Sequence, residues 1–416
     1  MNENTRSNER TLKLKYAVEL RRARVEGVDS DRPYVGLENI ESGTGRLIAA
    51  ANTQVTDSEF ASAAGDSLSA VFQVGDILFG KLRPYLAKAW IAEFDGRCST
   101  ELLPLRPEKI EPRFGLYVIL SQRFINVVDA STFGSKMPRA DWEFIGNVPI
   151  PLPSHAQQLR IAHFLDSETA GIDALVAAKQ RLLDRLLEKR QAIVAEIVMR
   201  GLNPVAPLRP SGVDWLGDIP THWKVRRIAT LFTQRDERNQ PELPLLEVSI
   251  NAGVIIREFS TDKIEGTASD FNTYKVARRG DIAFNKMRMW QGAVGVAPVD
   301  GLVSPDYTVA KADACLRPDF ASLLFRTPSF SAECGRNSQG ITWDRLRLYW
   351  DGFRDIFMPL PPLVEQDAIL EAIQAATTKI DRLRTATEHS ITLLKERRGA
   401  LIAAAVSGQI EIPEVA

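Results

Sequence analysis

Two long stretches of the chain carry apolar residues at helical spacing, and the stretches before them do not. Residues 154–204 and 361–416 are dominated by Leu, Ala, Glu, Arg and Lys, with apolar side chains three, four and seven positions apart. In the first stretch, one seven-residue register holds Leu165, Ile172, Leu186 and Ile193, and a companion register holds Leu175 and Leu182. In the second stretch, the seven-residue register holds Ile373, Ile380, Leu394 and Leu401. This pattern predicts two long helices that pair through an imperfect coiled-coil seam. The alternative is that each helix packs only on its own globular domain.

The segments before each predicted helix have a different composition. They are richer in Val, Ile, Phe, Gly and Pro and show no long helical periodicity, which favours mixed α/β domains. Each of these segments ends in prolines, which disfavour helix in the preceding residue. The prolines that mark the two domain ends are Pro151, Pro153, Pro359, Pro361 and Pro362.

Comparison of the chain with itself shows a tandem repeat of about 205 residues. Gln158 recurs as Gln366, and from there the two halves align without a gap at an offset of 208. The pair Ile172-Asp173 meets Ile380-Asp381, and Glu188-Lys189-Arg190 meets Glu396-Arg397-Arg398. The domains before the helices repeat more faintly, since Gly75 to Arg83 resembles Gly280 to Arg288 at an offset of 205.

The repeat leads to a specific domain organisation. The predicted fold class is α+β, with two α/β domains in tandem repeat, separated by two long helices that form an antiparallel coiled coil. The predicted boundaries are 1–153 for the first domain, 154–204 for the first helical region, 205–360 for the second domain and 361–416 for the second helical region. Two diverged readers held at a fixed separation match a bipartite, asymmetric DNA site, as a symmetric dimer matches a palindrome.

Composition excludes several other classes of protein. The 416 residues are too many for one ordinary domain, and 44% hydrophobic with 25% charged residues is typical of a globular chain. No run of about 18 apolar residues exists, and Met1 to Arg10 is polar, so we expect a cytoplasmic protein without membrane contact. Cys98, Cys315 and Cys334 stand far apart, which predicts free thiols rather than a zinc site or disulfides. The net charge of -1 means that any DNA-binding surface is local.

Two motifs carry a family resemblance. The first is the segment from Ser211-Gly212-Val213-Asp214-Trp215-Leu216-Gly217 to Trp223, and the second combines Gln158 and Gln366 with the Ile-Asp pairs and the Glu-Lys/Arg-Arg triplets. With them the chain resembles the specificity subunit of type I restriction-modification enzymes. The first half departs from the family pattern, because it lacks the Trp-Leu-Gly motif and starts directly at Thr11-Leu12-Lys13-Leu14. That departure leaves the N-terminal boundary of the first domain open.

The resemblance implies a function and a set of partners. It implies that the domains at 1–153 and 205–360 are target-recognition domains for the two halves of a double-stranded DNA site. It also implies two methyltransferase subunits and restriction (motor-nuclease) subunits as partners, with S-adenosylmethionine, ATP and Mg on those partners. No cofactor is expected on this chain itself.

Catalytic motifs are missing from the sequence. Leu360-Pro361-Pro362-Leu363 lacks the amide and the aromatic ring of an adenine methyltransferase motif, and no phosphate-binding GxxxxGK[ST] loop is present. Pro305-Asp306 precedes Lys311, but Val309 stands where a nuclease would need a second acid. We therefore expect a non-catalytic subunit. The alternatives are a coiled-coil interaction scaffold with no DNA role and a self-sufficient nuclease or methyltransferase.

The candidate DNA-binding residues lie in two pairs of loops. Lys81, Arg83, Lys286 and Arg288 follow a predicted strand at matching positions, where a phosphate contact and simple solubility of a strand end are both open. Basic side chains also stand in the polar loops near Gly134 and Gly340, and these are Lys136, Arg139 and Arg345. Gly75 and Gly280, with Asp76 and Asp281, are expected to form a turn into a buried strand. Trp290, Trp343 and Trp350 could stack on bases, although isolated tryptophans are more often part of the core.

Overall fold

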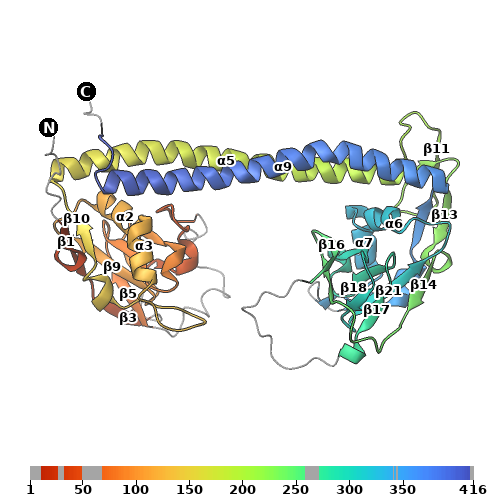
Figure 1. The fold of residues 1–416 in the computed structure, drawn as a ribbon, viewed down its shortest axis with the longest axis horizontal. Helices are drawn as coiled ribbons and strands as arrows, with labels where there is room; N and C mark the ends of the chain where they lie inside the picture. Colours follow the sequence, from red (N-terminus) through yellow and green to blue (C-terminus); the bar gives the residue numbers. More distant parts are fainter. Residues whose placement is uncertain are drawn as a thin grey trace. The chain divides into compact units, whose positions relative to one another are not determined.

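The computed structural model describes residues 11–26, 32–48, 68–257, 271–340, 342 and 345–412. These residues fall into two compact units (Figure 1). Unit 1 comprises residues 1–180 and 389–416, and unit 2 comprises residues 181–388. The long helices α5 (His155–Arg200) and α9 (Leu363–Val406) each contribute one part to each unit. We call the part of unit 1 that precedes α5 domain 1, and the part of unit 2 between α5 and α9 domain 2.

Domain 1 is built from short strands and short helices. Its strands are β1 (Thr11–Lys13), β2 (Val18–Leu20), β3 (Arg24–Glu26), β4 (Tyr34–Val35), β5 (Leu68–Phe72), β6 (Ile77–Gly80), β7 (Ala89–Ile91), β8 (Gly96–Cys98), β9 (Leu102–Pro107) and β10 (Pro149–Pro151). Its helices are η1 (Leu14–Tyr16), η3 (Leu37–Asn39), η5 (Pro84–Leu86), α2 (Pro112–Leu120), α3 (Gln122–Asp129) and α4 (Trp142–Ile145).

Domain 2 has the same kinds of element. Its strands are β11 (Leu208–Pro210), β12 (Asp218–Pro220), β13 (Lys224–Arg227), β14 (Phe232–Arg235), β15 (Leu246–Ser249), β16 (Gly253–Ile256), β17 (Lys275–Ala277), β18 (Ile282–Asn285), β19 (Val294–Val296), β20 (Gly301–Val303), β21 (Tyr307–Ala312) and β22 (Phe357–Leu360). Its helices are η6 (Ile228–Thr230), η7 (Phe271–Thr273), η8 (Met289–Gln291), α6 (Pro318–Phe325), α7 (Pro328–Arg336) and α8 (Trp350–Asp355). The mixed α/β composition expected from the sequence is confirmed in both domains.

The central sheets of the two domains have the same antiparallel topology. The strand order is β2-β9-β6-β7 in domain 1 and β14-β21-β18-β19 in domain 2. In each domain a strand near the start pairs with the last strand, as β1 with β10 and β13 with β22. The α2–α3 and α6–α7 pairs follow the central sheets, and each second helix begins at a hydroxyl cap, Ser121 or Thr327. Each sheet and its helices enclose a separate hydrophobic core.

The predicted turn into a buried strand is confirmed in both domains. Gly75 and Gly280 adopt φ of +86° and +89°, a conformation that favours glycine, and β6 and β18 follow immediately. The next residue is a buried aspartate that accepts a hydrogen bond from the backbone three positions earlier. It also pairs with an arginine of the edge strand region, Arg21 with Asp76 at 2.5 Å and Arg235 with Asp281 at 2.6 Å. Each pair ties the turn to the central sheet.

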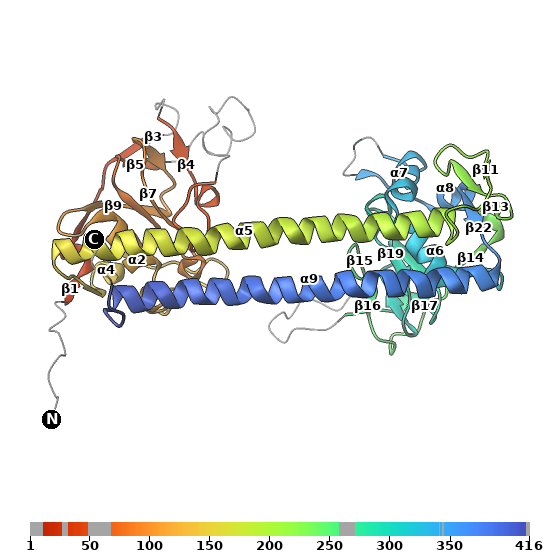
Figure 2. The ribbon, with the colours of Figure 1, turned by 90° about the horizontal axis from the view of Figure 1, so that it is seen from above.

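The two long helices lie side by side within each unit, as the views in Figures 1 and 2 both show. Buried apolar positions of the predicted register are Leu165, Ile172 and Leu186 on α5 and Ile373 and Ile380 on α9. The companion register is wrong, because Leu175 and Leu182 are 46% and 39% exposed. Polar residues occupy part of the seam instead, since Thr387 and Arg398 are buried.

The family motifs on these helices form the same ion pair in each unit. Arg398 of α9 lies 3.0 Å from Asp173 of α5 in unit 1, and Arg190 of α5 lies 3.0 Å from Asp381 of α9 in unit 2. The Ile-Asp pair of one helix therefore meets the Glu-Lys/Arg-Arg triplet of the other. The Ile-Asp motif and the Glu-Lys/Arg-Arg motif each occur twice in the sequence, and together they form two ion pairs between the helices, one in each unit.

The recurring glutamine joins each long helix to the domain before it. The side-chain oxygen of Gln158 accepts from the backbone N–H of Glu111 at 2.7 Å, and its amide donates to the carbonyl of Pro153 at 2.9 Å. Gln366 repeats both contacts, with Arg317 N–H at 2.7 Å and the Pro361 carbonyl at 2.9 Å. Both glutamines are buried, so each satisfies backbone groups that water does not reach.

Across the described residues, every helix is too short or too polar to cross a lipid bilayer. The predicted domain boundaries stay predictions, because the two structural units divide both long helices between them.

Candidate nucleic-acid interface

In domain 1, four of the candidate residues lie in two loops that are hydrogen-bonded to each other. Lys81 and Arg83 follow β6 directly. The backbone N–H of Ala140 donates to the Lys81 carbonyl at 3.0 Å, and the N–H of Arg83 donates to the Pro138 carbonyl at 2.7 Å. The structure therefore brings Lys81 and Arg83 beside the loop that carries Lys136 and Arg139.

The charges of this loop pair are not equally available. Lys136 and Arg83 are exposed, and the guanidinium of Arg83 reaches the carbonyl of Lys136 at 3.4 Å. Arg139 is half-buried, and its Nε donates to a carboxylate oxygen of Glu101 at 3.0 Å. Part of the positive charge of Arg139 is therefore balanced within the domain.

Domain 2 repeats this loop arrangement. The backbone N–H of Leu348 donates to the Lys286 carbonyl at 2.9 Å, as Ala140 does to Lys81 in domain 1. Arg288 and Arg345 are exposed. In the described part of this loop, the backbone N–H of Arg345 donates a hydrogen bond to the carbonyl of Thr342 at 3.0 Å.

The structure identifies Arg347 as the counterpart of Arg139, which the choice of Arg345 missed. Arg139 exchanges two backbone hydrogen bonds with Phe133, and Arg347 exchanges two with Gln339. Each arginine directly precedes the residue that bonds the strand-end lysine. The sequence held the signal, because Arg139 and Arg347 lie 208 positions apart, the same offset as the helices.

Aromatic side chains accompany the basic loops. Tyr85, in the short helix η5 after Arg83, is 52% exposed, and Phe133 is 57% exposed. Trp290 stands at the same position in η8, where its indole N–H donates to the Met287 carbonyl at 3.0 Å. Trp350 is different, because its ring packs at 5.9 Å from the buried Phe353. Trp343 lies outside the described residues.

The described side chains form neither a disulfide nor a metal-binding cluster. All three cysteines are free thiols, as expected. Burial raises the pKa of Cys98 to about 12 and raises that of Cys334 as well, which keeps both thiols protonated. No group of three or more His, Cys, Asp and Glu side chains in the described ranges is arranged to hold a metal ion. The described loops carry exposed basic and aromatic side chains, among them Arg83, Tyr85 and Arg288, and such a surface suits nucleic acid.

Comparisons with known proteins agree with this interpretation. Residues 48–183 match the family model described as the type I restriction modification DNA specificity domain. The type I restriction enzyme EcoDI specificity subunit of Escherichia coli is 28% identical over 125 residues, which are 30% of this chain and 28% of the relative. The EcoKI specificity subunit of Escherichia coli strain K12 is 21% identical over 323 residues, which are 74% of this chain and 67% of the relative.

A solved structure shares the fold of the whole chain. That structure is described as showing the structural basis of complex assembly and conformational transition of the type I R-M system. It aligns with this chain with a TM-score of 0.66 and 18% sequence identity. The alignment covers 98% of this chain and 100% of the solved one. The matches define a class of proteins that contain DNA specificity domains. Within that class, the chain is similar to type I restriction-modification specificity subunits, and the first of these relatives is matched over 28% of its own length.

Proposed function

We propose that the chain recognises DNA for a type I restriction-modification complex, with each domain reading one half of a bipartite, asymmetric site. The observation that carries this proposal is the repeated pair of basic loops, Lys81 beside Ala140 and Lys286 beside Leu348, on central sheets of the same topology. Two domains that share a scaffold but carry different side chains on the same loops can recognise two different DNA sequences.

The proposal assigns the predicted basic residues to the DNA backbone. Lysine and arginine at loop tips neutralise phosphates and fix the register of a protein on the duplex. The residues proposed for this role are Lys81, Arg83, Lys136, Arg139, Lys286, Arg288 and Arg345, with Arg347 added as the counterpart of Arg139. Base edges would then be read by neighbouring side chains of the same loops.

The proposal also includes the arrangement of the two domains as a tandem repeat around an antiparallel coiled coil. Support comes from the Asp173–Arg398 and Asp381–Arg190 pairs, because each joins α5 to α9 in its own unit. A paired rod of helices would give the two readers a fixed separation. The DNA site would then have two specified halves and an unread spacer of constant length.

Partners are proposed to bind at equivalent positions on the two helices. Leu175 and Leu383 lie 208 positions apart and are 46% and 45% exposed, so the two helices offer apolar side chains at matching positions. Two equivalent apolar positions fit two methyltransferase subunits, and restriction subunits would join that complex. Catalysis, S-adenosylmethionine, ATP and Mg are assigned to those partners.

Exchange of one domain tests the two-reader model. Residues 11–150 are replaced by the matching domain of another type I specificity subunit, and the complex with its methyltransferase is used to map methylated sites in genomic DNA. We expect one half of the methylated sequence to change while the other half and the spacer stay the same. Exchange of residues 224–358 is the matched control and should change only the other half.

Two outcomes would contradict the proposal. If both half-sequences changed together after one exchange, the domains would not be independent readers. If the purified complex showed no salt-sensitive binding to duplex DNA, the interaction scaffold without a DNA role would be the better description.

A further inference from the structure

In unit 1 a loop of domain 1 is bonded to an arginine of the helix pair. We call residues 41–46 the hairpin loop of domain 1. The guanidinium of Arg398 on α9 donates to the carbonyl of Gly43 at 2.6 Å and to that of Thr44 at 3.3 Å. Arg398 is 8% exposed, so its guanidinium depends on protein acceptors in place of water. One side chain of α9 therefore connects the helix pair of unit 1 with domain 1.

A carboxylate of α5 completes this contact. One oxygen of Asp173 lies 3.0 Å from Nε of Arg398, and the other pairs with Arg46 of the hairpin loop. The three nitrogens of Arg398 thus face three oxygens at once, one from the carboxylate and two from backbone carbonyls. The ammonium of a lysine is a single point of charge and cannot reproduce this planar arrangement.

The hairpin loop in turn supports a basic loop that is proposed to contact DNA. The backbone N–H of Gly43 donates to the carbonyl of Ala87 at 2.9 Å. Ala87 is the C-cap of η5, which carries Tyr85, and Arg83 is its N-cap. Both caps adopt left-handed backbone conformations, with φ of +50° at Arg83 and +48° at Ala87, which are uncommon for residues with a Cβ. Such a turn persists only where neighbouring contacts hold it, and Gly43 supplies one of them.

Domain 2 has a corresponding hairpin loop. In domain 1, Tyr34 pairs in parallel with Arg97 shortly before the hairpin loop. In domain 2, Leu245 pairs in parallel with Leu302, which lies 205 positions after Arg97. The turn between β15 and β16, residues 250–252, is therefore the counterpart of the hairpin loop of domain 1.

This second loop is held by its own domain rather than by the helix pair. Arg326, which directly follows α6, donates to the carbonyls of Ile250 and Asn251 at 2.5 and 2.6 Å. Arg190 of α5 is the counterpart of Arg398, and its Nε donates to Asp381 of α9 at 3.0 Å. Among the described residues, no hydrogen bond joins Arg190 to the second loop. The two helix arginines therefore differ in what they hold.

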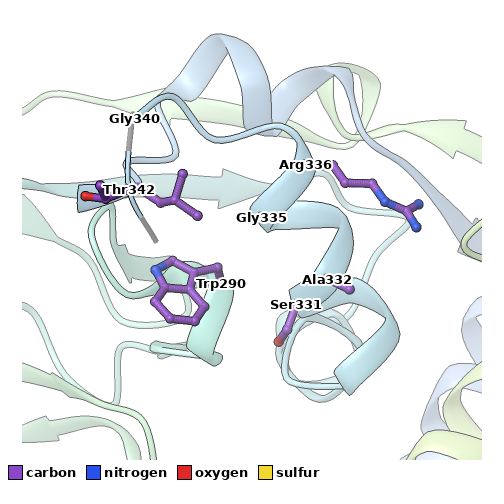
Figure 3. A pocket seen from close by; sticks show the side chains of 8 residues that line it. Trp290, Ser331, Ala332, Gly335, Arg336, Gly340 and Thr342 are labelled. Atoms are coloured by element: carbon purple, nitrogen blue, oxygen red, sulfur yellow. The ribbon is translucent and has the colours of Figure 1, made fainter. Parts of the chain in front are cut away.

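The basic loop of domain 2 is also supported within its domain. The short helix η8, the counterpart of η5, packs against α7, and Figure 3 shows Trp290 across from Ser331. The residue at the position of Ala87 is Gly292, whose carbonyl accepts from the N–H of Val294 at 2.9 Å. Glycine adopts its φ of +82° without steric cost. Support of a basic loop by a helix arginine is thus a feature of domain 1.

We propose that Arg398 is a positioning residue for DNA recognition by domain 1, and that it acts through the hairpin loop on the basic loop of Arg83 and Tyr85. The inference rests on the proposed function, because it requires that this basic loop contacts DNA. Its effect is confined to the half-site of domain 1, since Arg326 holds the second hairpin loop. The helix pair is then coupled to one reader and not to the other.

Replacement of Arg398 by lysine tests this coupling. The assembled complex with its methyltransferase subunits is titrated with duplexes of the sequence that it methylates, and with duplexes that carry one changed base pair in either half-site. Arg398→Lys should lower affinity roughly tenfold, because the side chains of Arg83 and Tyr85 are then ordered only on binding. The loss of affinity caused by a changed base pair should shrink in the half-site of domain 1 and stay the same in the other half-site.

Two further variants separate this role from a general effect on the helices. Arg190→Lys is the matched control, since it alters the same type of ion pair in unit 2, and it should bind like the unaltered chain. Arg46→Ala removes the second anchor of the hairpin loop at an exposed position, where substitution leaves the fold intact. It should give a smaller loss of affinity than Arg398→Lys, again with weaker discrimination in the half-site of domain 1.

Two measurements follow the path from Arg398 to the basic loop. Hydrogen exchange at the amide of Gly43 should accelerate in Arg398→Lys and stay unchanged in Arg190→Lys. In a chain that carries both Arg83→Ala and Tyr85→Ala, Arg398→Lys should cause no further loss of affinity, because the side chains on which it acts are gone.

Failure of this inference differs from failure of the proposed function. Unaltered affinity and unaltered half-site discrimination in Arg398→Lys and Arg46→Ala overturn the inference while recognition by domain 1 stands. An equal loss in Arg190→Lys, or a full loss that persists without the side chains of Arg83 and Tyr85, overturns it too. If the complex with the unaltered chain shows no salt-sensitive binding to duplex DNA, the proposed function itself is wrong. Copurification with the methyltransferase and the circular dichroism spectrum confirm that each variant is folded.

Discussion

The two domains agree inside and differ at their loops. Each has the buried aspartate after the glycine turn, Asp76 or Asp281, and each is joined to its long helix by a buried glutamine. At the loop face, by contrast, Tyr85 stands where domain 2 has Trp290, and Asp129 where it has Gly335. The contacts that hold the scaffold are therefore the constant part of the repeat, and the side chains open to a ligand are the variable part. This division is expected where two copies of one scaffold recognise different sequences.

A second difference lies at the start of each domain. In unit 2 the segment before β13 packs into the core, because Leu216, Ile219 and Trp223 are all buried. In unit 1 the described residues begin at Thr11, the first residue of β1, so the segment before that strand lies outside them. Only domain 2 therefore carries a described aromatic anchor at this place.

The largest effect is expected from Trp223→Ala. The side chain is 1% exposed, and removal of a buried aromatic ring costs about 3–5 kcal/mol of folding free energy. Hydrogen exchange should accelerate in β18 and β21 of unit 2, while β6 and β9 of unit 1 keep their protection. Leu208→Ala, at an exposed position of the same segment, is the control and should change little. Equal acceleration in both units would show that Trp223 does not act within unit 2 alone.

A smaller difference is expected between the two buried aspartates. Asp76→Asn removes the carboxylate that pairs with Arg21 and should destabilise unit 1 by about 2–4 kcal/mol. Asp281→Asn should cost less, because Arg235 keeps a second carboxylate, Glu237, at 3.4 Å. Denaturant unfolding followed by hydrogen exchange in each unit measures both values. A larger loss for Asp281→Asn would mean that Glu237 does not compensate.

The sequence predicted more of the scaffold than of the surface. Periodicity and prolines located the long helices, and the recurring Gly75-Asp76 and Gly280-Asp281 predicted the turns that the structure confirms. These features depend on backbone conformation and spacing, which the sequence expresses directly. The sequence did not predict that Leu175 and Leu182 would be exposed, because a heptad register cannot tell a helix partner from solvent or another subunit.

The candidate site was harder to predict for a different physical reason. The basic character of a residue is visible in the sequence, but its hydrogen-bonding partner is not, and the partner decides how much of the charge is available. The sequence shows Arg139 only as a basic residue in a loop, whereas the structure shows that its guanidinium pairs with the carboxylate of Glu101. Arg347 was passed over for Arg345, two positions away, because only the backbone bonds with Gln339 show which residue corresponds to Arg139.

The two equivalent arginines provide the finest test of the comparison. If both contact phosphate, Arg347→Ala should lower the slope of log affinity against log salt by about 0.9, the loss of one phosphate contact. Arg139→Ala should lower it less, because Nε of Arg139 is held by Glu101 at 3.0 Å. Glu101→Gln releases that guanidinium from a carboxylate and should strengthen binding at low salt. Fluorescence anisotropy of labelled duplex with the assembled complex, at several salt concentrations, measures all three. Because Arg139 and Glu101 share one contact, Glu101→Gln with Arg139→Ala should bind like Arg139→Ala with Glu101 intact. A Glu101→Gln gain that persists without Arg139 would show that Glu101 repels DNA directly rather than by restraining the arginine.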